Sequence, residues 1–325
     1  MKKTRESESL MVKFHDFAQI RKLQKDSGKS VLYTKAISIL IIYVALWVKA
    51  TFFLPEEVWA IHLWYTLRAI SIVLVGFWIL HDVGHGAFFH SPSTNRKLYR
   101  LIEALIGANI FLWVFQHNAH HGSPNSPDDT DIQQAPFMRL HKDQELKWYH
   151  RYQYIYAFPL YSLGYIAWVG RRDFKRMFWT GRIDDGKSGR PQKLKVTKQQ
   201  QSNMLVNKGV FVLITIVIPI VINGWSVVLP IIVMLITVGF LLSLVFQLAH
   251  VNTFSRTLSL EEVRKMDYLE MQLATTTDFA TGPIWTQILG GLNLQVVHHV
   301  AMNVDHTKLY EVSKLLKRFA REHGL

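Results

Sequence analysis

Long uncharged runs are the first feature of the chain. Residues 209–255 contain no Asp, Glu, Lys or Arg. A transmembrane helix needs about 20 apolar residues, so this segment is long enough for two. Asn223 and Gly224 form a strong turn signal inside it. We therefore predict two antiparallel membrane helices, at about residues 207–222 and 226–251.

Two similar runs lie earlier in the chain, at about residues 36–54 and 58–80. The first is interrupted by Lys49, which lies close enough to one end to extend its amine to the interface. The second contains Arg68, for which no sequence feature accounts. The pattern predicts an all-α integral membrane protein with four transmembrane helices, in a single domain covering residues 1–325.

Two other apolar stretches are ambiguous by length. Residues 101–116 are short for a crossing and include Glu103, whereas residues 152–170 are longer but include Pro159 and two glycines. A crossing by either stretch would separate the histidine motifs described below. We therefore expect both stretches to dip into the membrane without crossing it.

The charge distribution predicts the orientation. The chain has 37 Lys and Arg against 24 Asp and Glu, a formal net charge of +13. Basic residues concentrate in the N-terminal region, in residues 171–198 and after residue 256, whereas the connections near Glu56 and Asn223 contain none. The positive-inside rule then predicts that both termini and residues 171–198 are cytoplasmic, beneath a bacterial inner membrane or, in a eukaryote, the endoplasmic reticulum. The basic surface is either a solvated loop or a contact for anionic membrane lipids; we expect no nucleic acid partner.

The chain lacks cysteine but is rich in histidine, with 15 residues. Disulfides, thiolate nucleophiles and cysteine-bound iron–sulfur clusters are therefore excluded. Any metal must be bound mainly by imidazole and carboxylate groups.

Eight histidines occur in four places at the predicted inner boundary. The segments HDVGH and HNAHH have H-x-x-x-H and H-x-x-H-H spacing, which places at least two rings on one face of a helix. The third place is at the end of the last predicted span, and the fourth is a His-His pair near the C-terminus. One such motif often arises by chance, but four at one membrane face predict a metal site. The predicted ligands are His81, His85, His117, His120, His121, His250, His298 and His299.

Eight imidazoles exceed the needs of one ion, so we predict two. Beside apolar spans the substrate is expected to be a lipid chain, and no protein side chain cleaves an unactivated C–H bond. A redox metal with O2 can do so, and imidazole suits iron, which predicts a cofactor of two Fe ions. We expect no catalytic residues beyond the metal site.

Two other functions are compatible with the histidine pattern. A di-iron hydroxylase of alkyl, acyl or carotenoid substrates would use the same oxidant. A membrane metal transporter or sensor would also be rich in histidine, but it needs ligands along a path through the bilayer, whereas these cluster at one face.

The three histidine motifs, in this order and position, resemble the histidine boxes of the membrane fatty acid desaturase family. The segments HHGSPNSPDDTDI, HRYQYIY and GGLNLQVVHH are similar to motifs of its front-end branch, the linoleoyl-CoA and acyl-lipid Δ6/Δ5-type desaturases. Gln295, in place of the first histidine of the third box, is typical of that branch. The resemblance implies that the eight histidines are di-iron ligands and that a new double bond forms on the carboxyl side of an existing one.

Further residues are candidates near the site. Gln295 is expected to be a ligand or a neighbour of the metals, and polar residues of the motifs are expected to orient the histidines. Phe77 and Trp78 either anchor their span at the interface or line an acyl channel. The near-site candidates are Gln295, Asp82, Asn125, Asp129, Asp131 and Asp278.

The resemblance also implies the partners. They are a fatty acyl lipid or acyl-CoA, O2 and membrane lipids. Because the H-P-G-G motif of a fused cytochrome b5 domain is absent, we expect a separate electron carrier of the ferredoxin or cytochrome b5 type. The sequence departs from the branch pattern at Tyr154, Val297 and residues 300–302. We expect these departures to affect the position of the new double bond and not metal binding.

Overall fold

The computed structural model describes residues 9–26, 29–129, 137–140, 144–180, 182–183 and 192–325. This part of the chain is almost entirely helical, as predicted. The exception is a pair of two-residue antiparallel strands, β1 (Arg182–Ile183) and β2 (Gln192–Lys193).

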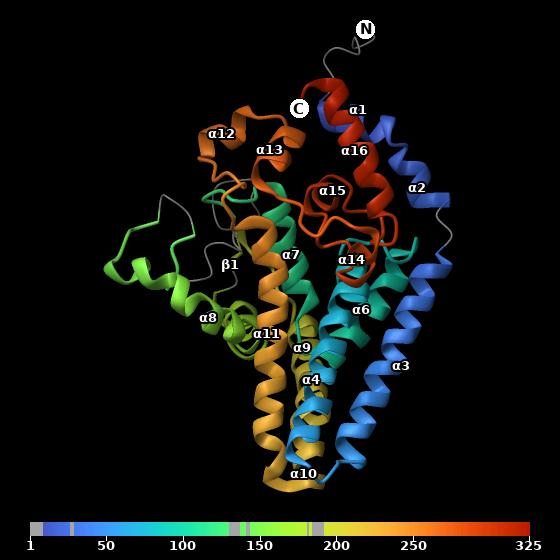
Figure 1. Cartoon of the computed structure of the whole chain (residues 1–325), viewed down its shortest axis with the longest axis vertical. Helices are drawn as coiled ribbons and strands as arrows, with labels where there is room; N and C mark the ends of the chain where they lie inside the picture. Colours follow the sequence, from blue (N-terminus) through green and yellow to red (C-terminus); the bar gives the residue numbers. More distant parts are fainter. Residues whose placement is uncertain (1–8, 27–28, 130–136, 141–143, 181, 184–191) are drawn as a thin grey trace.

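Long apolar helices form a bundle that occupies the lower part of Figure 1. Among the described residues, three helical runs are long and apolar enough to cross a membrane. The third run turns back on itself at the 3₁₀ turn Gly224–Val227, where Gly224 has a φ of 68°, so the predicted Asn-Gly turn is confirmed. The first run is Ser30–Phe52 (α3), and the second is Val58–Gly84, made of α4, a π-helical turn and α5 (His81–Gly84). The third is Lys198–His250, made of α9, a π-helical turn, α10 (Ile218–Asn223), the 3₁₀ turn and α11.

The ends of these helices differ from the predicted boundaries. Helix α3 begins at Ser30 and α9 (Lys198–Val212) at Lys198, several residues before the apolar runs begin. A capping box sets the start of α9: the backbone N–H of Gln200 donates to the Thr197 hydroxyl, and the Thr197 N–H donates to the Gln200 side chain. Caps satisfy the first free amides of a helix, and they can lie outside its apolar part.

The first ambiguous stretch is sharply bent. Helices α6 (Pro92–Ile106) and α7 (Ile110–Gly122) meet at an angle of 103°. The bend passes through Gly107, whose φ is 70°, and the amine of Lys208 donates to the Gly107 carbonyl. Residues 101–116 therefore do not form one straight helix.

The second ambiguous stretch forms α8 (Gln153–Ala167) and the π-helical turn Trp168–Arg172. It packs against α11 (Val228–His250), where the Ser243 hydroxyl donates to the Tyr161 carbonyl at 3.1 Å. It is not one of the three candidate runs found in the described part of the chain.

A layer of shorter helices lies at one end of the bundle, at the top of Figure 1. Its core joins the two ends of the chain, since Phe14, Leu269, Val297 and Phe319 are buried together. We call this region the end layer. It contains α1 (Leu10–Phe17), α2 (Ile20–Asp26), α12 (Leu260–Lys265), α13 (Tyr268–Thr275), α14 (Pro283–Ile288), α15 (Gln295–Val300) and α16 (Leu309–His323).

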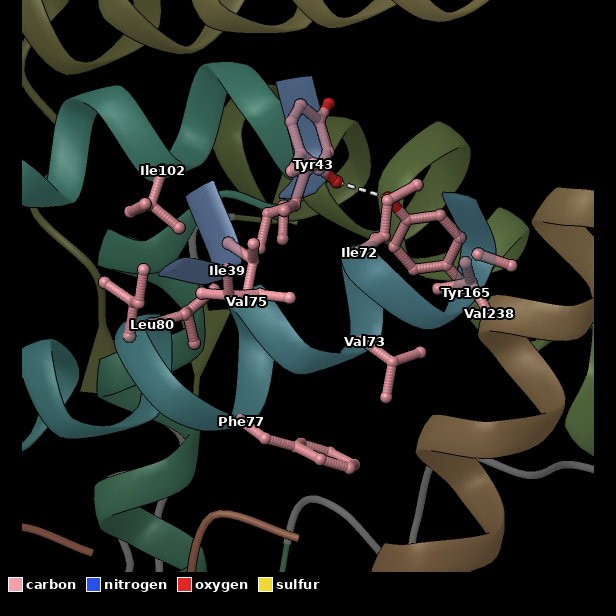
Figure 2. Packing of buried hydrophobic residues seen from close by; sticks show 14 of the residues in the cluster. Ile39, Tyr43, Ile72, Val73, Val75, Phe77, Leu80, Ile102, Tyr165 and Val238 are labelled. Atoms are coloured by element: carbon pink, nitrogen blue, oxygen red, sulfur yellow. Dashed lines mark hydrogen bonds between the residues drawn. The ribbon is translucent and has the colours of Figure 1, made fainter. Parts of the chain in front are cut away.

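The bundle core lies around α4 (Val58–Val75), as Figure 2 shows for Ile72, Val73 and Val238. Arg68 is also buried here, with 1% of its surface exposed. Its guanidinium lies 5.4 Å from the centre of the Tyr65 ring, so a cation–π contact offsets part of the cost of burying this charge.

Candidate metal centre

The helices bring all eight predicted ligands to the junction between the bundle and the end layer. His81 and His85 follow the π-helical turn Gly76–Leu80, and His250 ends α11. The HNAHH motif occupies the last turns of α7, while His298 and His299 lie on α15. Segments distant in the sequence thus converge at one place in the fold.

The histidines form two groups. Each offers ring nitrogens that all lie within 4.8 Å of one another, a separation that one metal ion can bridge. The first group is His81, His85, His117 and His298, and the second is His120, His250 and His299.

His121 lies between the two groups. Its Nε2 atom is 3.1 Å from Nε2 of His117 and 3.1 Å from Nε2 of His298. Its ring stacks on that of His299, with 4.1 Å between the centres. The eight histidines therefore form one continuous site.

The ring nitrogens are suited to a metal. The Nε2 atoms of His81, His85 and His299 are buried and have no hydrogen-bond partner among the described residues. Burial lowers the pKa of His298 and His299 well below its ordinary value, so both rings are neutral, the form that binds metals. A buried, unpaired nitrogen is costly unless something binds it, so the donor set fits a metal.

A carboxylate orients one ring of the second group. Oδ2 of Asp129 accepts the backbone N–H of Asn125 at 2.8 Å and lies 2.9 Å from Nδ1 of His120. Since a carboxylate only accepts, Nδ1 of His120 carries the proton and Nε2 keeps its lone pair for a metal. The Asn125 side chain donates to the carbonyls of His250 and Thr275, which fixes the segment beside the ring.

Gln272 orients a second ring, and sequence reasoning missed it. Its amide nitrogen donates to the His121 carbonyl at 2.8 Å, so its oxygen accepts the Nδ1–H of His299 at 2.7 Å. His299 then presents Nε2 to the site. No spacing rule links Gln272, in the middle of α13, to the histidine motifs.

The remaining near-site candidates lie in different settings. The Asp82 carboxylate lies 2.7 Å from Nδ1 of His306, and among the described residues it makes no hydrogen bond to a histidine of either group. Nε2 of His306 in turn lies 2.8 Å from the amine of Lys35. Asp278 accepts the N–H of Val296 at the start of α15. Gln295 is buried as the first residue of α15, and Asp131 lies outside the described residues.

His306 is the other residue that sequence reasoning missed. It lies outside the histidine motifs, yet it is completely buried against Asp82, the residue after His81. No motif surrounds it that could have signalled this contact.

An apolar cavity of about 30 Å³ adjoins His81. It is lined by Gly76, Phe77, Trp113 and Phe246, among others, and Figure 2 shows Phe77 beneath the core residues of α4. The adjacent Trp78 faces elsewhere, since its indole N–H donates to the Ile288 carbonyl. Of the two aromatic candidates, only Phe77 lines the cavity. A whole acyl chain would require the cavity to widen.

Comparison with known proteins gives a consistent result. The family model of fatty acid desaturases matches residues 57–325, which include all three histidine motifs. An sn-1 linoleoyl-lipid 6-desaturase of Arthrospira platensis is 29% identical over 90% of this chain and 79% of its own length. The enzyme of the same description from Synechocystis sp. is 29% identical over 79% of this chain and 72% of its own.

An acyl-lipid (8-3)-desaturase of Physcomitrium patens is 30% identical over 76% of this chain, which spans about half (52%) of its length. The resemblance to front-end acyl-lipid desaturases is confirmed. Desaturases are oxidoreductases that act on lipids, and the apolar helices agree with a membrane protein. The chain therefore belongs to the fatty acid desaturase family.

Proposed function

We propose that this protein introduces a double bond into the acyl chain of a membrane lipid, on the carboxyl side of an existing double bond. The observation that carries the proposal is the pair of adjacent, largely buried histidine groups beside an apolar cavity. The two 6-desaturases named above support the position of the new bond.

The proposed cofactor is a pair of iron ions. The first would be held by His81, His85, His117 and His298, and the second by His120, His250 and His299, with His121 between them. When bound, the irons supply, with O2 and two external electrons, the oxidising power that removing hydrogen from an unactivated alkyl chain requires.

The protein's own residues position the reactants. Asp129 and Gln272 hold two imidazoles in the tautomer that leaves Nε2 available. Phe77 and Trp113 would contact the chain beside His81 and keep water out of the apolar cavity. The burial of the histidines keeps bulk solvent from the oxidising centre.

We further propose that the whole chain is one domain with four membrane crossings, formed by α3, α4, α9–α10 and α11. Both termini, the end layer and residues 171–198 would face the cytoplasm, beneath a bacterial inner membrane. The apolar runs, the turn at Gly224 and the bend between α6 and α7 support this arrangement. A separate electron carrier would dock on the cytoplasmic surface, favoured by the chain's net charge of +13.

The test is to express the chain in a host that makes no polyunsaturated lipids, supply saturated and diunsaturated acyl chains, and locate the product bonds by mass spectrometry. We expect new bonds only between an existing bond and the carboxyl group. Bonds only on the methyl side, or hydroxylated chains alone, would overturn the proposal. The variant Gln295→His tests whether this amide sets the bond position, and it should retain iron.

A further inference from the structure

A second cavity lies away from the metal centre, where the 3₁₀ helix Trp148–Tyr152 leads into α8. Its volume is about 410 Å³. Four basic side chains contribute to its lining, together with Leu146, Trp148 and Gln153. The four are Arg139, Lys147, His150 and Arg151. This concentration of donors and positive charge is suited to an anion.

His150 provides the most specific feature of this cavity. The backbone N–H of Lys147 donates to Nδ1 of His150 at 3.0 Å, so Nδ1 is an acceptor and the proton lies on Nε2. Nε2 is buried and has no hydrogen-bond partner among the described residues, and only 9% of the side chain is exposed. An unpaired buried donor is costly, so a ligand oxygen at this position would be stabilising.

The surrounding segment is held in place by its own polar contacts. The Gln153 amide accepts from the N–H and donates to the carbonyl of Arg139, and the Tyr156 hydroxyl donates to the Phe137 carbonyl. These bonds fasten residues 137–139 to the start of α8. The backbone that carries Arg139 is therefore held against the start of α8.

The neighbouring charges leave the cavity cationic. Glu145 lies 3.6 Å from Lys147, but both side chains are largely exposed, and exposed pairs contribute little. The Arg151 guanidinium lies 4.7 Å from the centre of the Tyr152 ring. No acidic side chain lines the cavity among the described residues.

The flanking surface indicates where this cavity lies. Leu146, Trp148, Tyr154 and Ile155 are between 60% and 74% exposed, although they are apolar or aromatic. Exposed Trp and Tyr beside basic residues are typical of the level of lipid headgroups in a membrane. A ligand here would have an anionic group for the basic cavity and acyl chains for the aromatic rim.

We propose that this cavity binds the phosphate group of a membrane glycerophospholipid. His150 Nε2 would donate to a phosphate oxygen, and Lys147 and Arg151 would neutralise its charge. The HRYQ segment, which the metal centre does not use, would then be a lipid-binding motif: His150 and Arg151 contact the headgroup and Gln153 holds Arg139 in place. This site does not depend on which acyl bond the protein oxidises.

The test uses the full-length protein in detergent micelles and native mass spectrometry. The probes are phosphatidylglycerol, diacylglycerol with the same acyl chains, and inorganic phosphate alone. We expect phosphatidylglycerol to bind at least tenfold more tightly than diacylglycerol, and inorganic phosphate not to displace it at equal concentration. Equal binding of the two lipids would overturn the proposal, and displacement by inorganic phosphate would assign the cavity to free phosphate instead.

Substitutions distinguish lipid binding in this cavity from general electrostatic attraction to a basic protein surface. His150→Phe keeps a ring but removes the donor, and Lys147→Gln with Arg151→Gln removes two charges; each should lower the affinity for phosphatidylglycerol at least fivefold. The matched control, Lys195→Gln with Lys198→Gln, removes two exposed charges elsewhere and should bind normally. An equal loss in the control, or full affinity in His150→Phe, would contradict the assignment. If one of these variants fails to fold, the single substitution Arg151→Gln tests the same contact with phosphate.

Discussion

Asp129 and His120 form a hydrogen bond of 2.9 Å inside the histidine cluster, and Asn125 holds the same carboxylate oxygen through its backbone N–H. The variant Asp129→Asn can turn its amide nitrogen toward His120 and favour the wrong tautomer. We expect metal affinity to fall by about 10- to 100-fold, the usual cost of losing such a partner. Iron retained during titration with a chelator measures this change.

The matched control is Glu261→Gln, which removes an exposed carboxylate paired with Lys265. It should retain iron as the wild type does. If Asp129→Asn retains iron as well as the wild type does, the carboxylate does not orient His120.

Single histidine substitutions should distinguish the two groups. His85→Ala removes a ring from the first and His299→Ala one from the second. We expect either to lower desaturation by at least 100-fold, because ligands act as a unit, while the protein remains in the membrane. Iron per purified chain should fall from about two to about one. The exposed His90→Ala should retain both iron and activity, and near-normal iron in His85→Ala would contradict the first group.

Gly76 should influence the length of acyl chain that fits. It lines the cavity beside His81, and a Cβ added there would meet no atom within 4 Å, so the outer atoms of a larger side chain would compete for the cavity's small volume. We expect Gly76→Leu to lower conversion of the longest substrates at least tenfold and to spare shorter ones. The product profile from mixed acyl chains measures this preference.

Gly170→Leu is the control for this substitution. Gly170 also has open space at its Cβ position, but it is exposed and is not among the residues that line the cavity. We expect Gly170→Leu to give the same product profile as the wild type. If both variants shift the profile equally, or neither does, the cavity is not the acyl channel.

The cysteine-free chain allows a direct test of topology. Single cysteines at Glu56 and Ser226 should react with an impermeant thiol reagent in intact cells, whereas one at Lys195 should react only after permeabilisation. All three positions are exposed in the structure. The unmodified chain should remain unlabelled. Labelling at Lys195 in intact cells would show that α8 crosses the membrane.

The sequence predicted the long apolar helices well because uncharged runs of this length are visible in the composition alone. It predicted helix ends poorly where polar caps set them, as at Thr197 before α9. Helical spacing identified the histidines of α7, since residues three and four apart share a face.

The division of the histidines into two groups was not predictable, because it depends on how α5, α7, α11 and α15 meet. The hydrogen-bond partners of the histidine rings were equally unpredictable from the sequence. Gln272 is 27 residues from His299, and His306 is 224 residues from Asp82. Contacts at such separations leave no local pattern, whereas Asp129, nine residues from His120, lies within the same motif.

The π-helical turn at Gly76–Leu80 has a consequence for how one helix serves two environments. A π turn contains about one residue more than an α turn, so it acts as a one-residue insertion. The side chains that follow it are rotated about the helix axis relative to their positions in an uninterrupted α-helix. Tyr65 and Arg68 keep the α-helical register that packs them inside the bundle. His81 and His85 follow a register offset by about 100°. The offset lets one continuous helical run face the bundle core with one register and present its histidines to the cluster with another.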